Sequence, residues 1–132
     1  MNREQFIQYI SDEYGVDEDY LFAKHPLFCV FQHSSNRKWF AVVMDVPKNK
    51  LGLVGTEPLD VVNLKCASIL IGSLRKEPGI FPAYHMSKAN WISVALDGSV
   101  PDEQIKMLLY MSYDATAPKN KRKVKDINPS KE

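Results

Sequence analysis

The feature that most constrains the fold of this chain is a series of short apolar segments joined by short turns. Leu27–Gln32 and Trp39–Asp45 are rich in aromatic and β-branched residues, and the polar stretch that begins at His33 connects them as a hairpin. Leu51–Thr56 and Val61–Lys65 follow after connections that are equally short. Parallel strands need a crossover of about a dozen residues or more, and none is available here. We therefore predict an antiparallel meander over this half of the chain.

Apolar residues at helical spacing predict a helix over Arg3–Tyr14, before the first strand. Asn2 can cap this helix, and Gln5, three residues later, can reach back to it as in a capping box. Gly15 follows the last turn, where glycine commonly ends a helix. The sequence therefore predicts both ends of this helix as well as its existence.

The second half of the chain predicts two more helices and two more strands. The middle helix spans Ser68–Lys76 with Ile69, Leu70 and Leu74 directed inward, the two strands are Ala83–Met86 and Trp91–Leu96, and the last helix begins at Ser99 or Val100 with Ile105, Leu108, Leu109 and Ser112 on its buried side. The predicted fold class is therefore α+β, with an antiparallel sheet meander packed against an N-terminal, a middle and a C-terminal helix.

Charge divides the chain at about residue 117. Residues 1–117 hold 11 Lys and Arg against 14 Asp and Glu, a net charge of −3, whereas residues 118–132 hold 6 against 2, a net charge of +4. Five of these cations lie within seven residues: Lys119, Lys121, Arg122, Lys123 and Lys125. We expect one α+β domain over 1–117 and a disordered basic tail over 118–132. The tail is either an arm for phosphates or a solubilising terminus.

Several classes of protein are disfavoured by the sequence. Its apolar stretches are only a few residues long and no signal peptide precedes the first helix, so we expect a cytoplasmic protein without membrane contact. Cys29 and Cys66 both lie in apolar segments, which favours buried thiols over a disulfide framework or a zinc site.

Catalysis is disfavoured as well. The three histidines show no paired spacing for a metal, and no glycine-rich phosphate loop is present. A Cys–His nucleophile made from Cys66 and His85 stays open, because the sequence does not say whether the two side chains meet. We expect no enzyme, no cofactor and no bound metal.

The string from Pro82 to Trp91 concentrates the most unusual chemistry. It contains a phenol at Tyr84, an imidazole at His85, an amine at Lys88 and the indole of Trp91. These groups could bind an anion or stack on a nucleic-acid base. Alternatively, Tyr84, Met86 and Trp91 fill the core, and Lys88 is merely solvated.

The same string resembles the bacterial MmcQ/YjbR family, in which a Pro-Ala-Tyr-His-Met sequence, a nearby Lys and a Trp occur in this order. Three further segments carry the resemblance: Leu64-Lys65-Cys66, Leu96-Asp97-Gly98 followed by Pro101-Asp102-Glu103, and Ser112-Tyr113. The resemblance spans roughly residues 3 to 115 and leaves the tail outside. It implies a fold akin to that of frataxin and CyaY, with a curved antiparallel sheet packed on helices and a double-wing architecture like that of DNA-binding proteins.

Two functions follow as hypotheses. In the first, the protein binds DNA or RNA: the five tail cations anchor to phosphates while Lys65, Lys88, Tyr84, His85 and Trp91 meet the ligand. In the second, the protein is an interaction module that receives a protein partner on an exposed sheet face, marked by aromatic residues such as Trp39 or Trp91. In either case we expect a monomer.

Overall fold

The computed structural model describes residues 1–118, which fold into three α-helices and one five-stranded antiparallel sheet. The helices are α1 (Arg3–Tyr14), α2 (Ser68–Leu74) and α3 (Asp102–Thr116), with a short 3₁₀ helix η1 (Lys48–Leu51). The strands are β1 (Cys29–Gln32), β2 (Trp39–Pro47), β3 (Pro58–Lys65), β4 (Ile80–Pro82) and β5 (Trp91–Ala95), arranged in the order β1-β2-β3-β5-β4. This confirms the predicted α+β class. The first three strands form a meander, while β5 inserts between β3 and the edge strand β4.

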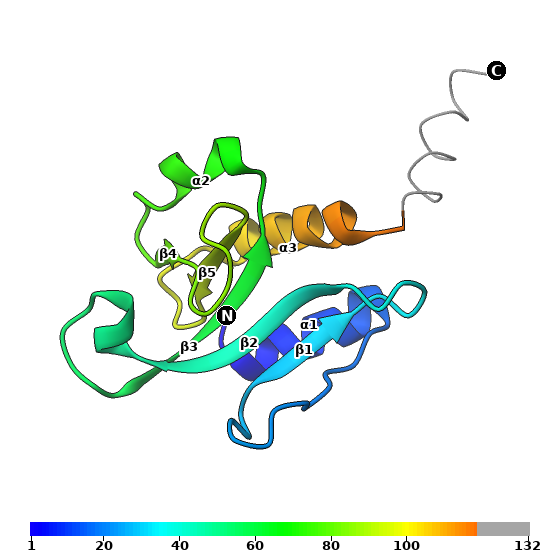
Figure 1. Cartoon of the computed structure of the whole chain (residues 1–132), viewed down its shortest axis with the longest axis horizontal. Helices are drawn as coiled ribbons and strands as arrows, with labels where there is room; N and C mark the ends of the chain where they lie inside the picture. The colour runs from blue at the N-terminus through cyan, green and yellow to red at the C-terminus, as the bar shows by residue number, and fades with distance from the viewer. Residues whose placement is uncertain (119–132) are drawn as a thin grey trace.

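The helices α1 and α3 lie on one face of the sheet (Figure 1). Phe6 and Ile10 of α1, and Leu109 of α3, are fully buried in one cluster with residues such as Leu64 and Ile92 of the sheet. Alternate residues of each strand point to opposite faces, so this cluster accounts for only half of the strand side chains. We call the opposite side the helix-free face.

A β-bulge in β2 sets which aromatic residues reach each face. Phe31 pairs with Ala41 and Gln32 pairs with Trp39, so Phe40 has no partner across the ladder. Phe40 and Ala41 consequently both pack in the helix-side cluster, while Trp39 packs against the helix-free face. The bulge therefore turns the indole toward the side that the helices leave uncovered.

The helix-free face is also apolar, and loops, the short 3₁₀ helix η1 and the edge strand β4 cover it in place of α-helices. Its buried residues include Val42 and Met44 of β2 and Val61 of β3. The side chains packed over them come from four places in the chain, namely Phe22 before β1, Leu51 in η1, Phe81 in β4, and Tyr84 and Met86 after it. The cover of this face is therefore assembled from separate segments of the chain.

Two predicted strands are wrong. Where a strand was predicted over Leu51–Thr56, the chain forms η1 and a turn, because Gly52 and Gly55 adopt left-handed backbone angles with φ of 81° and 106°. The strand predicted over Ala83–Met86 lies earlier, at Ile80–Pro82, and residues 83–90 form a loop. The predicted strand at Val61–Lys65 is confirmed and extends back to Pro58.

Among the helices, the prediction for α1 is confirmed in full, with the Asn2–Gln5 capping box and a left-handed Gly15 at the end. The inward side predicted for α2 is wrong in part: Ile69 is 87% exposed and Leu70 is 37% exposed, while Ile71 is the buried residue. The buried side of α3 is confirmed, although that helix begins at Asp102. No helix within residues 1–118 is long and apolar enough to cross a bilayer.

Candidate functional site

Two buried polar residues on the helix-free face hold the backbone of the loop that follows β4. Asn63 of β3 and Ser93 of β5 are directly opposite in the sheet, and both are fully buried. The Asn63 side-chain amide donates to the carbonyl of Tyr84 (2.8 Å), and the Tyr84 N–H donates to the Ser93 hydroxyl (3.0 Å). The Ser93 hydroxyl in turn donates to Asn63 Oδ1 (2.5 Å). This closed network satisfies both side chains and fixes Tyr84 over the sheet.

The next residue, His85, takes a backbone conformation that is uncommon for a side chain with a Cβ. Its φ is 60°, in the left-handed region, where histidine is tolerated better than most residues. This conformation brings its ring centroid to 4.0 Å from that of Tyr84. Tyr84 is half-buried and His85 is exposed, so the two rings offer an aromatic surface next to the backbone that Asn63 and Ser93 hold in place.

The pair separates two hollows on the helix-free face. The first, of about 220 Å³, is lined by His85 together with aromatic and aliphatic side chains, among them Phe22, Phe28, Trp39 and Met86. The second, of about 300 Å³, is lined by Tyr84 together with Lys50 and Lys88. No carboxylate lines either hollow. An aromatic cavity thus adjoins a cationic one, which suits a ligand that combines flat rings with negative charge.

The remaining predicted residues of the folded part, Lys65 and Trp91, lie directly opposite each other at one end of β3 and β5. Strand alternation places them on the same face as Asn63 and Ser93, two positions along each strand. Both are half-buried, and Trp91 belongs to neither buried cluster. The Lys65 backbone N–H donates to the buried hydroxyl of Ser112 (2.9 Å), which ties this strand end to α3.

The structure therefore brings Tyr84, His85 and Lys88 together and places Lys65 and Trp91 on the same face. Of the alternatives for the string, core filling describes Tyr84 and Met86 in part, since both pack against the buried cluster. The five predicted tail residues, Lys119, Lys121, Arg122, Lys123 and Lys125, lie outside the described residues.

Several residues of this face were missed by the sequence analysis. Phe22, His25, Phe28 and Lys50 line the two hollows, and the rings of His25 and Phe28 stack at 4.3 Å with an angle of 11°. Tight turns in the segment before β1 bring them there, since the N–H of His25 donates to Phe22 O and that of Phe28 to His25 O. One signal was available: the near-continuous apolar run of β2 indicates a strand that is covered on both faces.

The structure also answers the question of a Cys–His nucleophile. Cys66 belongs to the helix-side cluster, whereas His85 lines a hollow on the other face of the sheet, so the two side chains form no dyad. Burial raises the pKa of the Cys66 thiol, and burial raises the pKa of Cys29 to about 11. Within residues 1–118, no three His, Cys, Asp or Glu side chains are grouped so as to hold a metal ion.

The chain is similar to known proteins over most of its length. Residues 12–115 match the model of the YjbR family. The uncharacterized protein YyaQ of Bacillus subtilis is 36% identical over 116 residues, which cover 88% of this chain and 98% of YyaQ. The uncharacterized protein YjbR of Escherichia coli K12 is 34% identical over 98 residues, 70% of this chain and 83% of YjbR.

Solved structures agree with this relationship. A crystal structure of a Pseudomonas syringae protein superposes with a TM-score of 0.87 at 45% identity and covers 89% of this chain and all of that one. The crystal structure of protein DR2400 of Deinococcus radiodurans superposes with a TM-score of 0.69 at 25% identity, covering 97% of this chain and 89% of DR2400.

Proposed function

This chain belongs to the YjbR family, and from its helix-free sheet face we propose that it binds a single strand of nucleic acid. The observation that supports this function best is the junction of two hollows of different character at Tyr84 and His85. One hollow is aromatic, the other contains Lys50 and Lys88, and no carboxylate lines either of them.

The chemistry of a single strand fits this junction. Bases are flat and uncharged, and stacking each one on an aromatic ring contributes about 1–3 kcal/mol. Phosphates alternate with the bases and favour lysine ammonium groups nearby. The rings of Tyr84 and His85 lie between the two hollows, and Asn63 and Ser93 hold the backbone of Tyr84 there. A base could stack in the aromatic hollow while its phosphate lies in the hollow that contains Lys50 and Lys88. In a duplex the base faces are already stacked, so the folded body should prefer unpaired strands.

The basic tail would add a second contribution to the binding free energy, which is purely electrostatic. If its five cations each neutralise one phosphate, log K falls with log salt at a slope of about −4.5 on a duplex, and the tail reads no sequence. The folded body carries a net charge of −3, so only its local cations can contribute to phosphate binding. Binding by the tail should favour the duplex, which has the higher charge density, whereas binding by the body should favour the single strand.

Fluorescence anisotropy with a labelled single strand and a matching duplex distinguishes binding by the tail from binding by the folded body. The full-length protein is compared with the truncation 1–117, which retains every described helix and strand. We expect the truncation to keep a preference for the single strand and to lose most of the duplex binding. If the truncation binds neither probe at low salt, the sheet face is not a nucleic-acid site.

Variants then locate the site on the truncated protein. In Lys50→Ala/Lys88→Ala the salt slope should flatten by about 0.7 for each lost phosphate contact. Lys76→Ala is the matched control, because Lys76 is an exposed lysine that lines neither hollow. An equal effect of the control would show that only net charge matters.

One observation favours a second function, a binding module for a protein partner. The aromatic hollow adjoins apolar side chains that are about half exposed, Leu21 and Leu27, in the segment before β1. Such apolar surface often marks a protein interface. Under this alternative the truncation binds no oligonucleotide at any salt concentration. Under either function we propose a binding protein rather than an enzyme, acting as a monomer.

A further inference from the structure

A row of three side chains crosses the helix-free face at one end of the sheet. Lys65, the last residue of β3, lies directly opposite Trp91, the first residue of β5. On the other side of β3, the register with β2 ends at Ala41 and Leu64, and the next residue of β2 that faces the helix-free side is Trp39. Trp39, Lys65 and Trp91 therefore lie side by side on three neighbouring strands, and we call them the end row.

Trp91 is held in this row without filling the core. Its backbone N–H donates to the carbonyl of Ser87 (3.0 Å), and its pairing with β3 fixes the strand. The side chain is half-buried and belongs to neither buried cluster. Within residues 1–118, no other aromatic ring stacks on this indole or meets it edge-on. Since tryptophan is enriched among the residues that dominate binding, an indole held in this way suits a stacking ligand.

Lys65 places a positive charge between the two indoles. Its side chain is half-buried, which keeps the ammonium group close to the sheet. Within residues 1–118, this group forms no ion pair with a carboxylate and lies over the ring of neither tryptophan. The charge is therefore available to a phosphate.

The spacing of the end row suits successive nucleotides. Neighbouring strands lie about 4.8 Å apart, so the backbones of Trp39 and Trp91 are roughly 10 Å apart across β3, with the ammonium group between them. The row lies two positions, about 7 Å, along the strands from Asn63 and Ser93, which hold Tyr84. Trp39 also lines the aromatic hollow, so the end row adjoins the proposed site at this residue. The order of indole, ammonium and indole matches the order of base, phosphate and base in a single strand.

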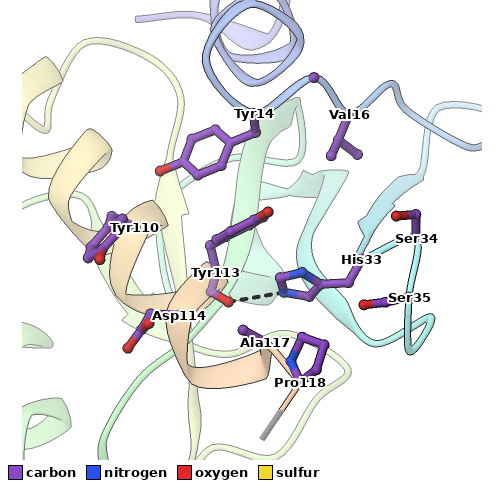
Figure 2. Close-up of a pocket in the computed structure, with 11 residues that line it drawn as sticks. Tyr14, Val16, His33, Ser34, Ser35, Tyr110, Tyr113, Asp114, Ala117 and Pro118 are labelled. Atoms are coloured by element: carbon purple, nitrogen blue, oxygen red, sulfur yellow. Dashed lines mark hydrogen bonds between the residues drawn. The ribbon is translucent and has the colours of Figure 1, made fainter. Parts of the chain in front are cut away.

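The last turn of α3 is fastened beside the same end of the sheet. Figure 2 shows His33, directly after β1, with its Nε2 hydrogen-bonded to the carbonyl of Tyr113 (3.0 Å). The side-chain amide of Asn36 donates to the carbonyl of Thr116 (3.0 Å). Tyr14 packs against Tyr113 with centroids 4.7 Å apart, and burial raises the pKa of Tyr14 to about 12. Packing and hydrogen bonds thus join the end of α3 to the β1–β2 turn.

The described chain consequently ends near the end row. Pro118, the last described residue, lines the same hollow as Ser34 and Ser35 of the β1–β2 turn (Figure 2). β2 begins with Trp39 shortly after this turn. Lys119, the first cation of the tail, follows Pro118 in the sequence. A strand bound by the tail would therefore meet the end row before it reaches the two hollows.

We propose that Lys65 and Trp91, together with Trp39, form a second stacking position of the single-strand site. Bases stack on the indoles, and the ammonium group of Lys65 binds the phosphate between them. This inference rests on the function proposed above, but it is separable from it, because the two hollows can bind a strand that does not contact the end row. It extends the site of the folded body across three strands of the sheet, toward the residues that precede the tail.

A thymidine hexanucleotide and an abasic hexamer are the probes, because they carry the same phosphates and only one of them has bases. Each is titrated into ¹⁵N-labelled full-length protein while the indole N–H resonances are followed by NMR. The chain contains two tryptophans, both in the end row, and Trp39→Phe identifies the resonance that remains as that of Trp91. We expect saturable shifts of the Trp91 resonance with the hexanucleotide and smaller shifts with the abasic hexamer.

Variants of the full-length protein test the two named groups, and the tail is the same in all of them. Trp91→Leu should weaken the thymidine hexanucleotide about fivefold or more, the effect of one lost stacked base, and leave the abasic hexamer unchanged. Trp91→Phe keeps a ring and should retain most of the affinity. Lys65→Gln should weaken both probes and flatten the salt slope by about 0.7. Lys76→Gln, an exposed lysine that lines neither hollow, is the matched control and should have no such effect.

The outcomes separate this inference from the function on which it rests. The inference alone is overturned if the hexanucleotide shifts the amide resonances of Tyr84 and His85 but neither shifts the Trp91 indole nor loses affinity in Trp91→Leu. It is also overturned if Trp91→Leu weakens the abasic hexamer as much as the thymidine one, since the indole then acts only through the fold. If the hexanucleotide does not bind at low salt, the function proposed for this face fails, and the end row fails with it.

Discussion

The buried pair of Asn63 and Ser93 makes the sharpest prediction about how this fold supports its candidate site. In Asn63→Ala, the carbonyl of Tyr84 loses its donor and the Ser93 hydroxyl loses its acceptor. A buried polar group that loses its partner costs about 1–3 kcal/mol, so we expect a loss of about 2–4 kcal/mol in the free energy of unfolding. Ser93→Ala should cost a similar amount, because it leaves the Tyr84 N–H and Asn63 Oδ1 unpaired.

The double variant is the more decisive measurement. Because the two side chains share the Ser93–Asn63 bond and the same loop residue, the second substitution removes groups that the first has already left unpaired. The double variant should therefore be less destabilised than the sum of the single ones, by about 1 kcal/mol or more. Urea denaturation gives these free energies, and the midpoint of each single variant should fall by about 1 M or more.

The matched control is Asn90→Ala, an exposed amide in the same loop. It should change the free energy of unfolding by less than about 0.5 kcal/mol. Asn63 and Ser93 do not act as one unit if the double variant loses as much free energy of unfolding as the two single variants together. The same conclusion follows if each single variant loses no more than Asn90→Ala. If the two single variants stay folded without urea but no longer bind the oligonucleotide, this unit also positions Tyr84 and His85 for binding.

Three other predictions concern the helix side of the molecule. Cys29 and Cys66, buried thiols with raised pKa values, should resist a thiol reagent at pH 8 in the folded protein and react at once in denaturant, as followed by absorbance. Tyr14 should ionise near pH 12 in an ultraviolet titration; since its folded pKa is raised above 10.0, the stability it contributes is complete below pH 10 and is lost as the pH rises toward 12. Leu109→Ala should lower the free energy of unfolding by about 2–5 kcal/mol in a denaturant titration, whereas Met107→Ala, on the exposed side of α3, should change it little.

The sequence predicted best where local chemistry alone determines structure. The bounds of α1 follow from the N-cap Asn2, its capping-box partner Gln5 and the terminal Gly15, which lie in the helix or directly beside it. The structure has all three features. The buried side of α3 follows in the same way from the spacing of Ile105, Leu108 and Leu109. Both helices are long enough for their periodicity to be informative.

The prediction failed where distant contacts decide the conformation. Residues 83–86 look like a strand in composition, yet Asn63 and Ser93 hold the backbone of Tyr84 out of the ladder, and His85 then takes a left-handed φ. The inward side predicted for the seven-residue α2 is wrong at Ile69 and Leu70 and right at Leu74, because so short a helix is oriented by packing rather than by its own pattern.

The candidate site shows the same division. The string from Pro82 to Trp91 was found from its chemistry, but its neighbours Phe22, His25 and Lys50 are 32 or more residues away in sequence and meet it only through the folded sheet. No spacing rule within a single sequence links residues so far apart.

The two edge strands of the sheet limit how this protein can associate with others. β1 has four residues and β4 has three, and β4 ends in Pro82, which has no N–H to donate. A foreign peptide in an extended conformation finds little unpaired backbone to continue the sheet, so strand addition and edge-to-edge aggregation are both disfavoured. Recognition of a partner is therefore left to side chains on the surfaces of the described residues rather than to the backbone of the sheet edges.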